Sequence, residues 1–437
     1  MFLRKSPPYL GIAGFFFLGT AILLRLPGCP LPGALGMAAA LSGAFFAALA
    51  LLRLPDGRTL RLTAVLAGVL LLARLPLFSV ETSDFTDFLL PWTERLRALG
   101  GFPGLGREIG NYNVPYMVLL ALFSYLRTPV LYLIKLSSVL FELLQAGVLA
   151  LLVRRLGGSL RREGLCFLLA LALPTVFLNS AVWGQCDSIY VSLALLGFYL
   201  CLAEKPGWGM AALGLSFAFK LQTVFLLPTV LLLLFAGRMK WYHLPIFPVV
   251  YALAVSPALL AGRSPADSFL FYLRTASTAG SGLNYNSPSL FSLYRFYWLD
   301  EAGRETAAKL GILAAFGLCL LLFALFLIRR KRITERSLLF AALLFALGLP
   351  LLLPHMHERY FYFCDLLSLC AAFLIPWMAA GVLLCQFASL LGYHAYFYLR
   401  YLLPMRLGFL ALCIVFAAVL FLCLRELFPR PPDPGDA

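Results

Sequence analysis

The chain has 437 residues, of which 62% are apolar and only 13% are charged. Soluble domains carry roughly 25% charged residues, so this composition excludes a soluble enzyme, a disordered chain and a fibrous protein. The 35 basic residues exceed the 20 acidic ones and give a formal net charge of +15. In a chain this apolar, an excess of basic residues first indicates which loops lie on the cytoplasmic side of a membrane. Nucleic-acid binding is only a secondary interpretation.

Apolar runs of about spanning length follow one another along the chain, whereas a β-barrel would need short alternating segments. The pattern predicts an all-α polytopic membrane protein with about 13–14 transmembrane helices. The first run lacks a small-residue cleavage site, so we interpret it as an uncleaved helix. The expected runs cover residues 9–24, 31–52, 61–80, 131–153, 164–180, 188–203, 209–237, 243–261, 308–328, 337–353, 360–377, 379–397 and 407–424.

These runs are expected to form five segments. Residues 1–60 hold two accessory helices, and residues 61–260 form a catalytic transmembrane module that includes an external loop at 81–130. A second external loop covers 261–307, and the C-terminal helices cover 308–425. The Pro-rich segment 426–437 is expected to be a disordered tail.

Basic clusters predict the orientation of the loops. Arginines and lysines near residues 4–5, 53–61, 154–162 and 329–336 are assigned to the cytoplasm, which places both termini inside. The segments 81–130, 262–307 and 355–360 then lie outside. The run 114–126 would rise only ~20 Å, so it is expected to be an interfacial helix. The run 209–237 is expected to bend near Lys220 into a hairpin with short arms.

The segment ETSDFTDFLLPW (81–92) places Asp84 and Asp87 just before an amphipathic helix. One chemical interpretation is that an aspartate acts as a general base on a hydroxyl group. The alternative, equally weighted from the residues alone, is that both aspartates cap the helix. The helix shows apolar residues at helical spacing, Phe88, Trp92, Leu96 and Leu99, and it is expected to end at Gly100–Gly101.

The segment AVWGQCDSIY (181–190) is a polar break between two apolar runs. Trp183, Gln185 and Asp187 are suited to line a sugar or headgroup site. Taken alone, the segment more often indicates a tight external turn with an interfacial tryptophan anchor.

The segment FKLQTVFLLP (219–228) places Lys220 and Gln222 in apolar surroundings. A buried lysine needs an anionic partner, which a lipid phosphate, Asp187 or Glu142 would supply. We favour the phosphate slightly over snorkelling of Lys220 to the membrane interface.

The segment LPHMHERY (353–360) gathers four polar residues between two apolar runs: His355, His357, Glu358 and Arg359. The arginine suits a phosphate, with His357 as a hydrogen-bond donor beside it. An interfacial group of salt bridges is the alternative. A zinc site is a poor interpretation, because the HxHE order is not the HExxH helix motif.

These motifs resemble those of known membrane enzymes. HMHERYFYF (355–363) resembles the HxHE(K/R) motif of the GT-C glucosyltransferases that use dolichyl-phosphate-glucose in N-glycan assembly. SDFTDFLLPW and FKLQTVFLLP resemble further segments of these enzymes. NYNVPY (111–116), WGQCDSIY and MHERY are similar to bacterial mannosyltransferases related to those of GPI-anchor assembly. The likeness covers about residues 61–400.

The resemblance implies a GT-C fold, a lipid-phosphate-linked sugar donor and usually no divalent metal or other cofactor. Asp84 matches the catalytic aspartate of these enzymes. The spacing from Asp84 to Trp92 is one residue longer than in the eukaryotic enzymes, so Asp87 is the second candidate for the catalytic base. Asn113–Val114–Pro115 replaces their Pro-Pro pair, so acceptor identity does not carry over. The implied donor-phosphate residues are Lys220, Gln222, His355, His357, Glu358 and Arg359, and the implied sugar or acceptor residues are Trp183, Gln185, Asp187, Asn111, Tyr112 and Tyr116.

We therefore expect an inverting glycosyltransferase of a bacterial plasma membrane with its active site outside. It would move mannose or glucose from a polyprenyl-phosphate donor to a lipid-linked or cell-surface glycan, with no nucleic-acid partner. The rival hypothesis is a lipid or small-molecule transporter or flippase, which usually shows inverted repeats and midplane sites. A non-catalytic scaffold is a weaker third option.

Overall fold

The computed structural model describes residues 7–277 and 282–429. Most of these residues are helical, and two strands among them, β1 (Asn284–Tyr285) and β2 (Met356–His357), form a short parallel pair. Among the described residues, eight helices are long and apolar enough to cross a membrane, or nine if one bent pair counts as a span. The protein is therefore an all-α, multi-pass membrane protein, which confirms the predicted fold class.

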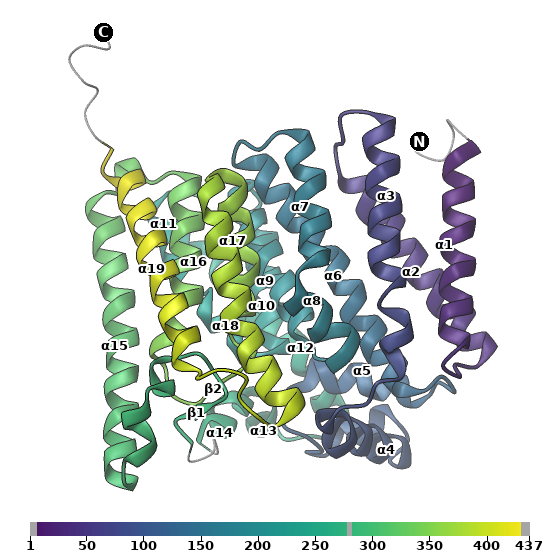
Figure 1. Cartoon of the computed structure of the whole chain (residues 1–437). Helices are drawn as coiled ribbons and strands as arrows, with labels where there is room; N and C mark the ends of the chain where they lie inside the picture. Colours follow the sequence, from purple (N-terminus) through teal and green to yellow (C-terminus); the bar gives the residue numbers. More distant parts are fainter. Residues whose placement is uncertain (1–6, 278–281, 430–437) are drawn as a thin grey trace. The chain divides into compact units, whose positions relative to one another are not determined.

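The chain divides into two compact units. Figure 1 labels their helices and strands. Unit 1 comprises Met1–Leu200, Gly207–Thr223 and Leu244–Ala279. Unit 2 comprises Cys201–Pro206, Val224–His243 and Gly280–Ala437. The five-segment division expected from the sequence stays a prediction.

Helix α6 (Val130–Arg155) forms the core of unit 1. It packs against α2 (Leu31–Leu51) and α7 (Leu160–Ala172), while α3 (Gly57–Leu72) packs on α7 and α1 (Pro7–Arg25) packs on α2 and α3. Most of α6 is buried. Its polar residues therefore face other protein segments and need partners within the chain.

A bend follows α7. Pro174 begins α8 (Pro174–Phe177), which continues as a π-helical turn over Leu178–Trp183, and this second segment lies at 50° to α7. Proline lacks an amide hydrogen and its ring clashes with the preceding turn, so a kink at this position is expected. The segment after the bend ends at Trp183, which lies within the polar segment 181–190 of the sequence.

The predicted external loop of unit 1 contains two short helices, α4 (Leu90–Ala98) and α5 (Val114–Ser124), which pack against each other. The eleven residues of α5 rise about 16 Å, so it is too short to cross a membrane, as predicted. The predicted end of α4 at Gly100–Gly101 is also confirmed. The helix ends at Ala98, and Gly100 and Gly101 have left-handed φ values of 83° and 77°. A side chain at Gly101 would overlap the ring of Tyr125.

Five more helices belong to unit 1. Helices α9 (Asp187–Leu202) and α10 (Pro206–Phe219) lie chiefly in this unit. Helix α12 (Ile246–Leu260) packs against α5 and against α13 (Pro265–Phe269), which is followed by α14 (Phe271–Ser277).

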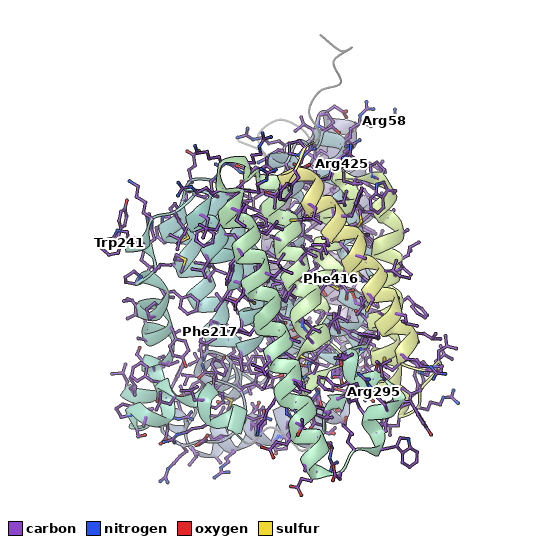
Figure 2. All side chains as sticks on the ribbon, turned by 90° about the vertical axis from the view of Figure 1, so that its left-hand side faces the viewer. Arg58, Phe217, Trp241, Arg295, Phe416 and Arg425 are labelled. Carbon is purple, nitrogen blue, oxygen red and sulfur yellow. The ribbon has the colours of Figure 1, made fainter. Side chains whose placement is uncertain are left out.

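Unit 2 is built around α16 (Glu335–Leu352), whose residues from Ser337 to Leu351 are all buried. Its neighbours are α11 (Pro228–Phe235), α15 (Glu301–Ile328), α17 (Tyr362–Leu374) and α19 (Arg406–Leu427), and α18 (Ala379–Tyr398) packs on α17 and α19. Figure 2 shows Arg425 near one end of this unit and Arg295 near the other, with Phe416 between them. Charged ends flanking an apolar band are typical of a membrane-spanning bundle.

Several predicted crossings are short helices, as expected, and eight helices of the described residues have full spanning length, or nine with the bent pair. Helix α9 has 16 residues and α17 has 13. The predicted break near Lys220 is present, because α10 ends at Phe219 and a 3₁₀ turn over Leu221–Phe225 precedes α11. Helix α19 continues to Leu427, so the first two residues of the predicted disordered tail are helical, and residues 430–437 lie outside the described residues.

A buried ion pair joins α6 to the segment after α3. The guanidinium of Arg74 donates to the carboxylate of Glu142 at 2.9 Å, and both side chains are fully buried. Arg74 also donates to the carbonyl oxygens of Leu70 and Leu171 at 2.6 Å. This arginine therefore links three parts of unit 1.

Replacing Glu142 with leucine should destabilise the protein strongly. The substitution leaves Arg74 as an uncompensated buried charge, which costs about 3–5 kcal/mol. The thermal unfolding midpoint in detergent measures the effect. The double variant Arg74→Met/Glu142→Leu is the control and should recover most of the loss. If Glu142→Leu alone unfolds like the wild type, the ion pair is not important for stability.

Candidate functional site

The carboxylate of Asp84 is the centre of a buried polar network in unit 1. The indole nitrogen of Trp183 donates to Asp84 Oδ2 at 2.8 Å, and the side-chain nitrogen of Gln185 donates to the same oxygen. Trp183 and Gln185 are buried, whereas Asp84 is half-buried. Two donors on one oxygen fix the orientation of a carboxylate that is still accessible.

The backbone around residue 184 explains how both donors reach Asp84. Gly184 has a φ of 76°, a left-handed conformation that ends the π-helical turn and reverses the chain. The amide of Gln185 donates to the carbonyl oxygen of Asn179 at 2.9 Å and closes this turn. Another π-helical turn, Phe85–Leu89, directly follows Asp84. Single π-helical turns of this kind are frequent at functional sites.

Tyr112 extends the network. Its hydroxyl group donates to the side-chain oxygen of Gln185 at 3.1 Å, and its ring packs on Tyr116 with centroids 4.7 Å apart. On the other edge, the ring of Trp92 contacts Tyr112 at 5.8 Å. The network thus joins the loop of Asp84, the turn at Gly184 and the start of α5.

A buried ion pair lies at the start of α9. The ammonium group of Lys220 is 2.5 Å from Asp187 Oδ1, and Asn179 donates to Asp187 Oδ2 at 2.8 Å. The Lys220 nitrogen also lies 5.9 Å from the ring centre of Tyr112 and 5.5 Å from that of Tyr190. Lys220 is therefore adjacent to the network of Asp84 through Tyr112.

Three alternatives from the sequence are corrected. Asp84 occupies a cap position but its side chain caps no backbone amide. Trp183 is fully buried, so it is not an interfacial anchor on an exposed turn. Lys220 is buried and does not snorkel; its carboxylate partner is Asp187, and Glu142 is paired with Arg74 instead.

The remaining predicted site residues of unit 1 are Asp87, Asn111 and Gln222. Asp87 is exposed, and it accepts a hydrogen bond from the hydroxyl group of neighbouring Thr86 at 3.0 Å. Asn111 is also exposed. The side-chain oxygen of Gln222 is buried and has no hydrogen-bond partner within the described residues. Only Asp84 of the two aspartates therefore joins the buried network.

In unit 2, the predicted motif 355–360 is held by the segment before it. The strands pair Asn284 with Met356 and Tyr285 with His357. The imidazole of His357 stacks on the ring of Tyr285 with centroids 4.7 Å apart and an angle of 14°. His355 has a φ of 61°, and its Nδ1 contacts the carbonyl oxygen of Gly282 at 2.7 Å.

The charges of this motif form an ion pair. Arg359 donates to the carboxylate of Glu358 at 2.6 Å, and His357 Nδ1 lies 3.8 Å from the other carboxylate oxygen. Burial by itself raises the pKa of Glu358, but the imidazole of His357 and the charge of Arg359 outweigh this effect and hold that pKa below its ordinary value. Glu358 therefore serves as the counter-charge for the basic residues of the motif.

The described residues contain no group of three or more His, Cys, Asp and Glu side chains placed to hold a metal ion. None of the ten cysteines, all of which the structure describes, forms a disulfide, and eight of them are buried. The cysteines are thus small apolar residues of the core.

Two features of the site were missed from the sequence. The first is Lys135 on α6, which is fully buried and donates to the carbonyl oxygens of Leu77 at 2.8 Å and Val80 at 2.6 Å. A single lysine inside an apolar run was the available signal. The second is the pairing of 284–286 with the histidine motif. No local pattern marks this pairing, because about 70 residues separate the strands.

A cavity of about 730 Å³ opens beside the loop of Asp84 in unit 1. Its wall includes Phe85, which follows Asp84 directly, together with Arg97, Arg127 and Tyr132. Leucines and prolines make up much of the remaining wall. The lining therefore mixes apolar side chains with two arginines, one acidic residue, Glu81, and the hydroxyl groups of Ser79, Thr128 and Tyr132.

Replacing Lys135 with methionine should loosen the segment that leads to Asp84. The ammonium group holds two carbonyl oxygens at the end of a 3₁₀ turn, and hydrogen bonds from a charged group contribute about 1.5–3 kcal/mol. Amide hydrogen exchange in residues 80–86 should therefore become roughly tenfold to hundredfold faster. Lys309→Met, at an exposed lysine of α15, is the control. Unchanged exchange in Lys135→Met would contradict this role.

Comparison with known proteins adds an independent finding. No curated protein matches the chain. The model of glycosyltransferase family 87 matches residues 111–354, which is more than half of the 437 residues. The matched stretch includes Tyr112, Trp183, Gln185 and Lys220, while Asp84 and the motif beginning at His355 lie outside it. The chain is a membrane glycosyltransferase that belongs to glycosyltransferase family 87.

Proposed function

We propose that the protein is an inverting hexosyltransferase of the GT-C type. It transfers mannose or glucose from a polyprenyl-phosphate carrier to a lipid-linked or cell-surface glycan. The reaction is a single displacement in which an acceptor hydroxyl attacks the anomeric carbon of the donor sugar. The bond between that carbon and the phosphate oxygen breaks, and the hydroxyl proton passes to a base.

The observation that carries this proposal is the network around Asp84. A general base must be an oriented carboxylate that a substrate reaches, and Asp84 is half-buried with one oxygen held by Trp183 and Gln185. Asp87 has no comparable support, because it is exposed and contacts its neighbour Thr86. We therefore assign the base to Asp84.

The sugar is assigned to the surroundings of Tyr112. Its ring and hydroxyl group, the amide of Gln185 and the Lys220–Asp187 pair offer the mixed aromatic and polar contacts that a hexose needs. The unpartnered side-chain oxygen of Gln222 supports its assignment as a further substrate contact.

The donor phosphate is assigned to His357 and Arg359 in unit 2. A leaving phosphate carries growing negative charge, which a guanidinium and an imidazole stabilise by charge-assisted hydrogen bonds. Tyr285 and Glu358 support these two side chains by stacking and ion pairing. This assignment requires no metal ion.

The acceptor is assigned to the 730 Å³ cavity beside Phe85. The cavity combines apolar side chains with the guanidinium groups of Arg97 and Arg127 and the carboxylate of Glu81, a mixed lining that suits a polar headgroup entering from a membrane. We assign this face to the outside of a bacterial plasma membrane, with both termini in the cytoplasm, on the basis of the basic loops. The family match favours an enzyme over the transporter alternative.

Replacing Asp84 with asparagine should reduce transfer by roughly 10²–10⁴-fold, the usual contribution of a general base. Asparagine keeps the shape of the side chain and can still contact Trp183 and Gln185, so folding and donor binding should persist. The measurement is transfer of radiolabelled mannose and glucose from polyprenyl-phosphate donors to a membrane lipid extract by the protein in nanodiscs. Donor binding is measured separately.

The matched control is Asp87→Asn, which removes the same charge three residues away and should change the rate only a few fold. Full activity in Asp84→Asn together with a large loss in Asp87→Asn would move the base to Asp87. Absence of transfer from either donor by the wild type would contradict the proposed donor class.

A further inference from the structure

Three of the four buried cations in the described residues have close carboxylate or carbonyl partners. Four lysines and arginines are buried: Arg74, Lys135, Lys220 and Arg263. Arg74 and Lys220 have carboxylates at 2.9 Å and 2.5 Å, and Lys135 donates to two backbone carbonyl oxygens. Arg263, in the connection between α12 and α13, is the least satisfied of the four.

Arg263 is only 8% exposed, yet two of its guanidinium nitrogens, Nε and Nη2, have no hydrogen-bond partner within the described residues. The nearest carboxylate is that of Glu108, at 3.6 Å from Nη2, and the Glu108 side chain is 60% exposed. The guanidinium carbon also lies 5.8 Å from the ring centre of Phe271. A buried guanidinium with two unused donors is costly unless another acceptor is present.

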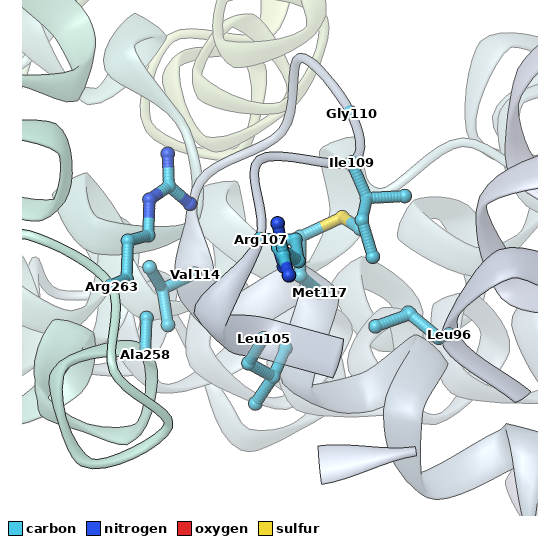
Figure 3. A pocket seen from close by; sticks show the side chains of 9 residues that line it. All are labelled: Leu96, Leu105, Arg107, Ile109, Gly110, Val114, Met117, Ala258 and Arg263. Carbon is cyan, nitrogen blue, oxygen red and sulfur yellow. The ribbon is translucent and has the colours of Figure 1, made fainter. Parts of the chain in front are cut away.

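A small cavity borders this arginine (Figure 3). Its volume of about 10 Å³ is just enough for one particle of about the size of a water molecule. Its lining contains two arginines, Arg107 and Arg263, and no acidic residue. The other lining residues are Leu96, Leu105, Ile109, Gly110, Val114, Met117 and Ala258.

The other charges near Arg263 leave the site positive. Arg274 lies close enough to repel Arg263, and it is itself ion-paired with Asp267. Tyr251 is beside both Arg263 and Asn113 but carries no charge as a neutral phenol. Among the described residues, Glu108 is the one acidic group acting on Arg263, and it offsets one of the two arginines of the lining.

We propose that this cavity is a binding site for one small inorganic anion of about the size of chloride, held by the guanidinium of Arg263 with Arg107 at its edge. A neutral water molecule would accept a hydrogen bond but would leave the positive charge uncompensated. A cation is excluded by the two arginines. A phosphate or a carboxylate-bearing metabolite exceeds the volume of the cavity.

The anion would join two loops of unit 1. One loop carries Arg107 and leads through Gly110 to Tyr112, and the other carries Arg263. The loops already approach closely, because a side chain at Gly106 would overlap the carbonyl oxygen of Ala261. An anion between them therefore stabilises the position of Tyr112, whose hydroxyl group contacts Gln185.

Thermal unfolding of the full-length protein in detergent tests the site. The wild type is compared in sodium chloride, sodium bromide and sodium gluconate at equal ionic strength. Chloride and bromide should raise the unfolding midpoint in a saturable way relative to gluconate. This shift should be lost in Arg263→Gln. It should persist in Arg274→Gln, which removes a nearby arginine outside the cavity lining.

An anomalous-scattering map from crystals of the wild type grown in bromide tests the same site without any variant. A bromide peak in contact with the Arg263 guanidinium is the expected result. An ordered water at this place without an anomalous signal would overturn the proposal. So would an equal chloride shift in wild type and Arg263→Gln, or stabilisation by inorganic phosphate but by neither halide.

Discussion

Charged side chains buried among apolar helices must find counter-charges or hydrogen-bond acceptors within the chain, and the arrangement of unit 1 follows from this requirement. Arg74 reaches Glu142 and thereby joins α6 to the segment after α3. Lys135 reaches the backbone ahead of Asp84, and Lys220 reaches Asp187 at the start of α9. Each contact fixes a backbone segment that also carries a residue of the candidate site.

The positions of the helices could be predicted from the sequence, because apolar runs of spanning length in a chain with so little charge indicate membrane helices. The residue types of the site were also predictable, since Asp84, Trp183 and Lys220 interrupt apolar surroundings. Their pairing was not. Glu142 and Asp187 were both candidate partners of Lys220 in the sequence, and in the structure Glu142 pairs with Arg74 whereas Asp187 pairs with Lys220.

Local backbone geometry accounts for further differences. The sequence around 181–190 is compatible with an exposed turn, but the bend at Pro174 and the π-helical turn before Gly184 direct Trp183 into the protein. Capping of a helix by Asp84 was an ordinary expectation, yet the π-helical turn that follows it leaves its carboxylate to Trp183 and Gln185. Neither π-helical turn has a recognisable sequence signature.

The most direct test of the proposed mechanism is the anomeric configuration of the product. A single displacement assisted by one base, Asp84, inverts the configuration of the transferred sugar relative to the donor. Nuclear magnetic resonance of the product formed from a polyprenyl-phosphate hexose of known anomeric form measures this outcome. The account predicts complete inversion. Retention would exclude an in-line single displacement and would contradict the proposed mechanism with Asp84 as its general base.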